Sequence, residues 1–317
     1  MQDRLRITKF PLFHGVACAL ALVATVASSA SGQARAAQRS GAAQWAAVEQ
    51  TLGRKGAVQP GDVIRFSFPR RDLQVTSNGV ALKPALALGS WVAFKRGGGD
   101  HAMVMGDLVL TEDEVNPVIS RLQEGGVQQT ALHNHVLVES PRVMYLHIAA
   151  HADAEVVART IRAALEATRT PLDTVAVAGN VSEVFDLDTA GIARTIGVAG
   201  RLNGGVYQVS IPRAERIMEG GREVPPSMGV ATAINFQPMD SGRAAITGDF
   251  VMTGREVNPV IRALRENGID VTALHSHMLD EQPRLFFMHF WANDDAMKLA
   301  LGLRAALDKT NSARARR

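Results

Sequence analysis

The residues of this chain with the clearest potential for chemistry are histidines that occur twice at the same spacing. Six of the nine histidines follow this pattern: His133, His135, His147, His275, His277 and His289. The offset between the two sets is constant, since 275 − 133 and 289 − 147 both equal 142. Neutral imidazoles bind zinc, copper, manganese and iron. Each set of three therefore predicts a site for a divalent metal ion, with zinc favoured.

A glutamate accompanies each set of histidines. Glu139 follows His135, and Glu281 follows His277, each after three intervening residues. Each carboxylate is predicted to act as a ligand, or as a general base toward a water molecule that the ion activates. Two alternatives remain open at this point. The histidines could form a structural hydrogen-bond network, or the neutral imidazoles could bind a ligand directly.

Two further pairs of polar residues recur at the same offset. Arg142 and Arg284 each follow a proline, and each is able to bind a substrate carboxylate or phosphate with two N–H groups. An ion pair with the preceding glutamate is the alternative. Asp107 and Asp249 complete a repeated Gly-Asp step and are predicted to orient a ligating imidazole through its other nitrogen. A role in a turn is the alternative for these two aspartates.

The histidines belong to a longer internal duplication. Residues 102–151 align without a gap with residues 244–293, and 25 of the 50 positions are identical. Such self-similarity predicts two copies of one domain. The predicted organisation is a signal peptide, a first repeat, a linker, a second repeat and a basic tail, at residues 1–36, 37–170, 171–186, 187–310 and 311–317.

The hydrophobic patterns within one copy predict its elements. Residues 244–252 are expected to form a strand, followed by a helix that Thr253 and Glu256 cap and that runs to residue 266. Two strands at 269–279 and 284–291 and a helix at 293–309 complete the unit. The first copy repeats this order, with helices at 112–123 and 153–166. The predicted fold class is α+β, with two tandem homologous domains, each a mostly antiparallel sheet with two packed helices.

The predicted strands bring the histidines of one repeat together. Side chains two residues apart point to the same face of a strand, so His133 and His135 are expected to be neighbours. Pairing with the following strand is expected to place His147 on the same face. A slip of one residue in that pairing would turn His147 to the opposite face. The prediction is thus one metal site within each repeat, and it leaves open whether the two sites act independently or converge at a shared interface.

The first 36 residues have the order of a signal peptide. Basic residues up to Lys9 precede an apolar run, and small residues follow it. An uncleaved membrane anchor is the alternative. Cys18, the single cysteine, lies inside the apolar run, and Gly15 stands where a lipid-attachment motif usually has leucine, so a lipid anchor is disfavoured. We therefore expect an extracytoplasmic location, periplasmic or secreted, and no membrane span after cleavage.

The same segment accounts for the formal charge of the chain. It contains four basic residues and one acidic residue, a net charge of +3 that equals the formal charge of the whole sequence. The remaining chain is close to neutral, which argues against a nucleic-acid partner. A small molecule or a cell-envelope ligand is the expected partner.

The duplicated motifs carry a resemblance to a known family. Gly-Asp, Glu-Val-Asn-Pro-Val-Ile, Thr-Ala-Leu-His-x-His and Glu-x-Pro-Arg, in two copies behind a signal peptide, resemble the LppY/LpqO family of exported bacterial proteins. That resemblance implies export and a duplicated architecture, and it implies no activity. The His-x-His…Glu pattern is also similar to the first metal motif of the cupins, although a helix precedes the strand and the glycine expected after Glu139 is missing.

Three functions follow from these observations. The favoured one is an exported metal-binding protein with a His-x-His…Glu…His site in each repeat; metal-dependent hydrolysis is one activity considered for it, and no reaction is assigned. A non-catalytic cell-envelope module that binds a ligand or glycan is the first alternative. A divergent bicupin-like metalloenzyme is the second.

Overall fold

The computed structural model describes residues 45–173 and 185–313 of the chain. Residues from Ala47 onward form one compact unit, and the part of the preceding unit that is described, Trp45 and Ala46, is helical. The predicted signal peptide lies outside the described residues, as do residues 174–184 of the predicted linker and 314–317 of the predicted tail. None of the helices in the described ranges combines the length and the apolar character that a bilayer crossing needs.

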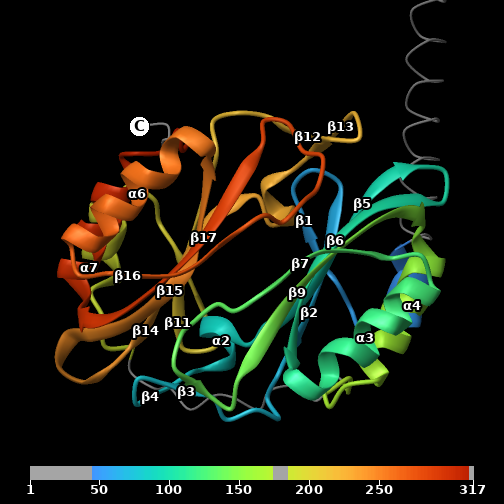
Figure 1. Cartoon of the computed structure of the whole chain (residues 1–317), viewed down its shortest axis with the longest axis horizontal. Coiled ribbons are helices and arrows are strands. Elements are labelled where there is room, and N and C mark those ends of the chain that lie inside the picture. The colour runs from blue at the N-terminus through green and yellow to red at the C-terminus, as the bar shows by residue number, and fades with distance from the viewer. Residues whose placement is uncertain (1–44, 174–184, 314–317) are drawn as a thin grey trace, which may run out of the picture. The chain divides into compact units, whose positions relative to one another are not determined.

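The first repeat forms a six-stranded antiparallel sheet in the order β1-β2-β5-β6-β9-β7 (Figure 1). Its strands are β1 (Ala57–Gln59), β2 (Val63–Pro69), β5 (Gly89–Gly98), β6 (His101–Thr111), β7 (Gln128–His133) and β9 (Val143–Asp153). Helices α3 (Glu112–Glu124) and α4 (Ala154–Glu166) follow β6 and β9 along the chain and pack against each other and against these strands.

The second repeat has the same topology, in the order β10-β11-β14-β15-β17-β16. Its strands are β10 (Arg201–Asn203), β11 (Val206–Pro212), β14 (Ala231–Pro238), β15 (Arg243–Thr253), β16 (Asp270–His275) and β17 (Leu285–Asp295). Its helices are α5 (Thr189–Ile196), α6 (Gly254–Glu266) and α7 (Ala296–Leu307). The predicted fold class is therefore confirmed, because two repeated α+β domains each carry an antiparallel sheet with packed helices.

Each repeat also contributes a small excursion that packs on the sheet of the other repeat. In the first repeat it comprises β3 (Thr76–Ser77), β4 (Val80–Ala81) and α2 (Pro84–Ala87), and a later strand, β8 (Glu139–Ser140), pairs with β3. In the second repeat it comprises β12 (Ile217–Glu219), β13 (Arg222–Val224) and η1 (Pro226–Met228). Helix α2 contacts β14 and β15, whereas η1 contacts β2 and β5. The two repeats are thus interlocked.

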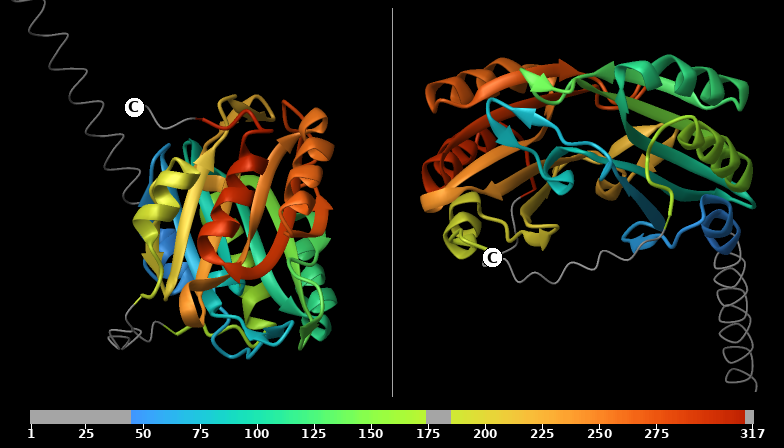
Figure 2. Two further views of the ribbon diagram at one scale, coloured as in Figure 1. Left: turned by 90° about the vertical axis from the view of Figure 1, so that its left-hand side faces the viewer. Right: turned by 90° about the horizontal axis from the view of Figure 1, so that it is seen from below.

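The two faces of each sheet are buried in different ways. On one face of the second sheet, Phe250 and Phe290 pack with residues of α6 and α7. On the opposite face, Phe287 belongs to an apolar cluster that also contains Met105 of the first repeat. Burying a side chain of this size removes about 2 to 3 kcal/mol of unfavourable hydration. Figure 2 shows the result in its right-hand view, where the helices of the two repeats lie on opposite outer sides of the sheets.

The helix starts follow the predicted capping pattern. The capping box of Thr253 and Glu256 is present at the start of α6, and Thr111 with Glu114 repeats it at α3. The structure adds a partner that the sequence did not indicate. The buried guanidinium of Arg213 binds Glu256 at 2.8 Å and the Val251 carbonyl at 2.7 Å, which ties the helix start to the sheet.

Two predicted boundaries were wrong. The strand expected at 269–279 ends at His275, because the chain leaves the edge of the sheet there. The helix expected from residue 293 begins at Ala296, because β17 stays paired with β15 as far as Asp295. The Asp295 side chain then accepts a hydrogen bond from the Lys298 backbone N–H and caps the helix.

Candidate functional site: a histidine cluster between the repeats

The pairing of β7 with β9 determines the direction of the first histidines. His147 lies opposite Ala131 and Tyr145 lies opposite His133. Because residues 131 and 133 share a face of β7, His133 and His147 point to the same side of the sheet, as strand alternation predicts. His135 follows the end of β7 and lies in a loop, so strand alternation does not position it.

The histidines of the two repeats meet in one cluster, because this face of each sheet is turned toward the other repeat. Three ring pairs, each with one member from each repeat, have centroids 3.7 to 3.8 Å apart: His133 with His275, His135 with His289, and His147 with His277. The prediction of a separate site within each repeat is therefore wrong. The repeats build a single histidine cluster between them.

The loops after β7 and β16 cross reciprocally into the other repeat. The Thr272 hydroxyl donates a hydrogen bond to the His135 carbonyl at 2.5 Å, and the Thr130 hydroxyl donates to the His277 carbonyl at 2.6 Å. The His135 ring stacks on Tyr145 with centroids 3.3 Å apart. These threonines are functional residues that the sequence interpretation missed, although they stand at duplicated positions in front of the His-x-His motif.

Glycine carbonyls orient three of the rings. Nδ1 of His289 bonds the Gly248 carbonyl at 2.7 Å, and Nδ1 of His277 bonds the Gly229 carbonyl at 3.2 Å. His147 likewise hydrogen-bonds the backbone of Gly106, and its Nε2 has no partner. An N–H group on Nδ1 leaves Nε2 as a bare lone pair, which is the state that binds a metal ion.

The glycine of the repeated Gly-Asp step is also required for a steric reason. A Cβ atom at Gly248 would overlap the Ala233 carbonyl on the neighbouring strand, so only glycine allows β14 and β15 to approach at this point. The following residue, Asp249, lies opposite His289 in the pairing of β15 with β17. The glycine thus positions both the carbonyl that orients His289 and the carboxylate next to it.

The two aspartates lie beside Nε2 atoms. Oδ2 of Asp249 is 3.1 Å from Nε2 of His277, and Oδ2 of Asp107 is 3.5 Å from Nε2 of His135. Neither Nε2 atom makes a hydrogen bond there. The orienting contacts to Nδ1 come from backbone carbonyls, with Asp249 Oδ1 farther away, 4.0 Å from Nδ1 of His289.

Burial sets the charge state of the cluster. Burial, reinforced by the neighbouring imidazoles, lowers the pKa of His133, His135, His147 and His275 well below the usual range for histidine. These rings are therefore neutral at pH 7. Burial also raises the pKa of Asp107 to about 7, with the negative charge of Asp249 adding to the effect and Arg65 opposing it.

Two groups of ring nitrogens are close enough together to hold an ion. In each group the ligand atoms lie within 4.8 Å of one another. The groups are His133, His275 and His289, and His147, His275 and His277. Ligand atoms about 2.1 Å from one ion lie about 3.0 to 3.4 Å apart, so nitrogens of a group that are separated by up to 4.8 Å must draw together for an ion to bind. His135 belongs to neither group.

The predicted glutamates and arginines lie at the loops beside the cluster. Glu281 is buried and accepts hydrogen bonds from the Leu285 backbone N–H at 2.8 Å and from Arg284 at 3.1 Å. Burial raises the pKa of Glu139, which lies in β8. Arg142 is exposed, and its nearest acidic partner is Glu112 at 3.9 Å. Neither glutamate belongs to the two groups of metal-binding nitrogens.

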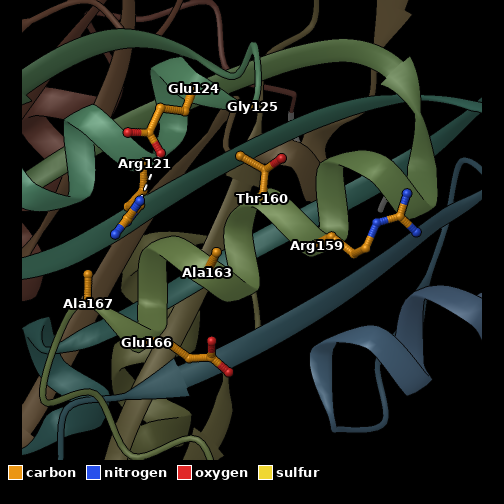
Figure 3. A pocket seen from close by; sticks show the side chains of 8 residues that line it. All are labelled: Arg121, Glu124, Gly125, Arg159, Thr160, Ala163, Glu166 and Ala167. Atoms are coloured by element: carbon orange, nitrogen blue, oxygen red, sulfur yellow. Dashed lines mark hydrogen bonds and ion pairs between the residues drawn. The ribbon is translucent and has the colours of Figure 1, made fainter.

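A shallow groove lies on the helix side of the first repeat, between α3 and α4 (Figure 3). Its lining residues are Arg121, Glu124, Gly125, Arg159, Thr160, Ala163, Glu166 and Ala167. Its charged groups are paired along the helices, as in the ion pair of Arg121 with Glu124 at 3.0 Å. The groove is thus a solvated helix surface on the opposite face of the sheet from the histidines.

Fold and site together define a duplicated α+β protein whose two repeats enclose a histidine cluster. The chain belongs to the family described as Domain of Unknown Function (DUF1259), whose model matches residues 46–167 and again residues 190–309. This match replaces the resemblance to the LppY/LpqO family, which was wrong. No curated protein matches the chain.

Solved structures similar to the chain include two described as microcompartment shell proteins, together with EtuB. The trimeric shell protein PduB is 13% identical, and the two chains match over 80% of this chain and 88% of that one, with a TM-score of 0.20. EtuB from Clostridium kluyveri is 10% identical over 80% and 88% of the two chains, with a TM-score of 0.20. The double-ringed trimeric shell protein MSM0271 from the RMM microcompartment is 10% identical over 80% and 96%, also with a TM-score of 0.20.

These comparisons correct the functional predictions made from the sequence. The family model that matches the chain describes neither export nor an enzyme, and the predictions of secretion through a signal peptide and of an extracytoplasmic location are not retained. The exported metal-dependent hydrolase, the cell-envelope module and the bicupin-like enzyme are dropped with them. At a TM-score of 0.20 the likeness is too low for any property of the shell proteins to be carried over to this chain.

Proposed function

We propose that this protein binds a divalent transition-metal ion in the histidine cluster, and that the ion joins the two repeats. One observation carries the proposal: Nε2 of His277 faces the Asp249 carboxylate at 3.1 Å while Nδ1 of the same ring bonds a backbone carbonyl. With its N–H on Nδ1, this ring turns the Nε2 lone pair toward a carboxylate oxygen. Two such acceptors at this distance repel each other unless a proton or a metal ion lies between them, and we propose the metal ion.

The lack of partners elsewhere in the cluster supports the proposal. Nε2 of His147 and both ring nitrogens of His275 are buried without a hydrogen bond. A buried polar atom without a partner costs about 1 to 3 kcal/mol. A structural hydrogen-bond network would satisfy these nitrogens, but the one bond between two rings of the cluster joins His133 and His289 at 3.1 Å. A bound ion would satisfy them instead.

The chemistry of the donors limits the ion. Imidazole nitrogens with one carboxylate suit zinc and copper, with manganese and iron as further members of the set. His133, His147 and His275 are neutral at pH 7, so protons do not compete with an ion for their nitrogens.

The position of the cluster links binding to folding. Each ligand group takes nitrogens from both repeats, since His275 and His289 join His133, and His147 joins His275 and His277. An ion that binds only when the repeats are docked stabilises the folded chain by mass action, by about 2.7 kcal/mol at a free concentration 100 times Kd.

Metal analysis of the full-length protein tests the proposal. We expect at least one equivalent of Zn²⁺ or Cu²⁺ to bind after the protein has been stripped and reloaded, with a rise in Tm of several degrees. His277→Ala combined with His289→Ala removes a ligand from each group and should abolish both effects. His151→Ala is the matched control, because His151 is exposed on β9 outside both groups. Binding of less than one ion by the folded wild-type protein would overturn the proposal.

A further inference from the structure

The two ligand groups share one residue. His275 belongs to both groups, whereas His133 and His289 belong to one, and His147 and His277 to the other. A residue that offers one ligand atom serves only one ion at a time. The shared membership therefore means either that the two groups exclude each other or that His275 uses a different nitrogen for each.

The environment of His275 favours the use of both nitrogens. Its Nδ1 and its Nε2 are both buried and both lack a hydrogen-bond partner. The rings of His277 and His289 differ in this respect, because a glycine carbonyl occupies Nδ1 in each and leaves Nε2 alone for an ion. The His275 ring stacks on His133 at a centroid distance of 3.7 Å and lies tilted against His277 at 5.0 Å.

We infer that the cluster holds two metal ions at once and that His275 bridges them through its two ring nitrogens. This inference rests on the proposed function. One ion is held by His133, His289 and one nitrogen of His275. The other ion is held by His147, His277 and the second nitrogen of His275. The five-membered ring then separates the two ions by about 6 Å.

The proton balance of the bridge is definite. A neutral imidazole carries one N–H, so binding the second ion through that nitrogen breaks the N–H bond and releases one proton to solvent. The bridging ring becomes an imidazolate anion, whose negative charge lies between the two cations and offsets their repulsion. The carboxylate of Asp249, 3.1 Å from Nε2 of His277, adds negative charge beside the second ion.

The two sites are unequal. Asp249 belongs to neither ligand group, but its Oδ2 lies 3.1 Å from Nε2 of His277 and places negative charge beside the site of His147, His275 and His277. The other site is formed by the imidazoles of His133, His275 and His289, and one coordination position of its ion stays free for water. We therefore expect the His147 and His277 site to bind its ion more tightly.

Counting the ions in single variants tests the bridge. Native mass spectrometry of the full chain with Zn²⁺ should show two ions for the wild type, and one ion for His133→Ala and for His277→Ala. His275→Ala should weaken both sites at least tenfold, because it removes a ligand from each. His151→Ala should retain two ions, and circular dichroism of every variant verifies that it is folded.

The Cu²⁺ form supplies a second measurement that does not depend on loss of binding. Two Cu²⁺ ions bridged by an imidazolate are magnetically coupled, so the doubly loaded wild type should show an electron paramagnetic resonance signal well below that of two isolated ions. His133→Ala, loaded with one ion, should show the full signal of that ion. A wild type that binds one ion overturns the bridge and leaves the proposed function standing. Two uncoupled ions, or two ions retained by His275→Ala, overturn the bridge alone, whereas no bound ion overturns both.

Discussion

The rings of His133 and His275 stack on each other across the boundary between the two repeats, with their centroids 3.7 Å apart. These two residues occupy equivalent positions in the duplication, at the offset of 142 residues. Their contact means that each repeat supplies half of one site. Both copies have the same histidine spacing because both face the same cluster. A single repeat on its own would leave its three histidines exposed to solvent.

The reciprocal threonine bonds should hold the histidine loops in place. Thr272→Val removes the hydroxyl that donates to the His135 carbonyl and leaves a partly buried carbonyl without this partner. We expect a loss of about 1 to 2 kcal/mol in the free energy of unfolding. Denaturation in urea measures it. Thr160→Val is the control, because its hydroxyl bonds the Val156 carbonyl on an exposed helix surface, and its stability should stay within about 0.5 kcal/mol of the wild type.

Gly248→Ala tests the close approach of β14 and β15. The new methyl group would overlap the Ala233 carbonyl, so the strands must separate. We expect a loss of more than about 2 kcal/mol in stability, together with weaker metal binding because the carbonyl that orients His289 moves. The matched control is Gly254→Ala at the start of α6, where the methyl group would meet Phe286 at 3.4 Å, an ordinary contact. Equal stability of the two variants would contradict the steric account.

The buried ion pair of Arg213 with Glu256 predicts a dependence of stability on pH. Burial alone would raise the pKa of Glu256, but the hydrogen bonds from Arg213 and from backbone N–H groups outweigh it and hold the pKa below the usual value. A carboxyl group with a lowered pKa stabilises the fold above its unfolded pKa, and this contribution is lost as the pH falls through the folded pKa. Stability should therefore decline below about pH 4.5.

Variants at this pair separate its contribution from the rest of the acid response. Arg213→Met leaves a buried carboxylate without its partner and should cost about 3 to 5 kcal/mol at pH 7. Glu256→Gln should flatten the decline in stability at low pH, as measured by thermal unfolding over a pH series. Lys298→Ala, which breaks the exposed ion pair with Asp294, should cost less than about 1 kcal/mol.

The sequence predicted the elements well because local patterns determine them. Thr253 with Glu256 marked the start of a helix, and the helix begins there. Strand alternation placed His133 and His147 on one face of the sheet, and the pairing of β7 with β9 puts them on the same face. These signals act over a few residues. The ion pair of Arg213 with Glu256 spans 43 residues and carries no such signal.

The convergence of the six histidines could not be predicted by the same reasoning. Alternation tells which face of a strand a side chain occupies, and it does not tell what covers that face. The loop at His135 gave a further error, because the strand was extended through it while the chain in fact leaves the sheet at His133. The duplicated threonines in front of the histidines were the available signal, since Thr130 and Thr272 link the loops of the two repeats.

The two aspartates provide the sharpest test of the asymmetry in the site. Asp249 lies 3.1 Å from Nε2 of His277, a member of a ligand group, whereas Asp107 lies 3.5 Å from Nε2 of His135, which belongs to neither group. Asp249→Asn keeps the shape of the side chain and removes its charge. We expect the Zn²⁺ affinity of Asp249→Asn to fall at least tenfold, measured by competition with a chelating dye, because the negative charge beside the ion at His277 is removed. Asp107→Asn should stay within about threefold of the wild type, since each tenfold change corresponds to about 1.4 kcal/mol and no ligand is lost. The reverse order of the two affinities would place the ion beside His135 and would contradict the assignment of the ligand groups.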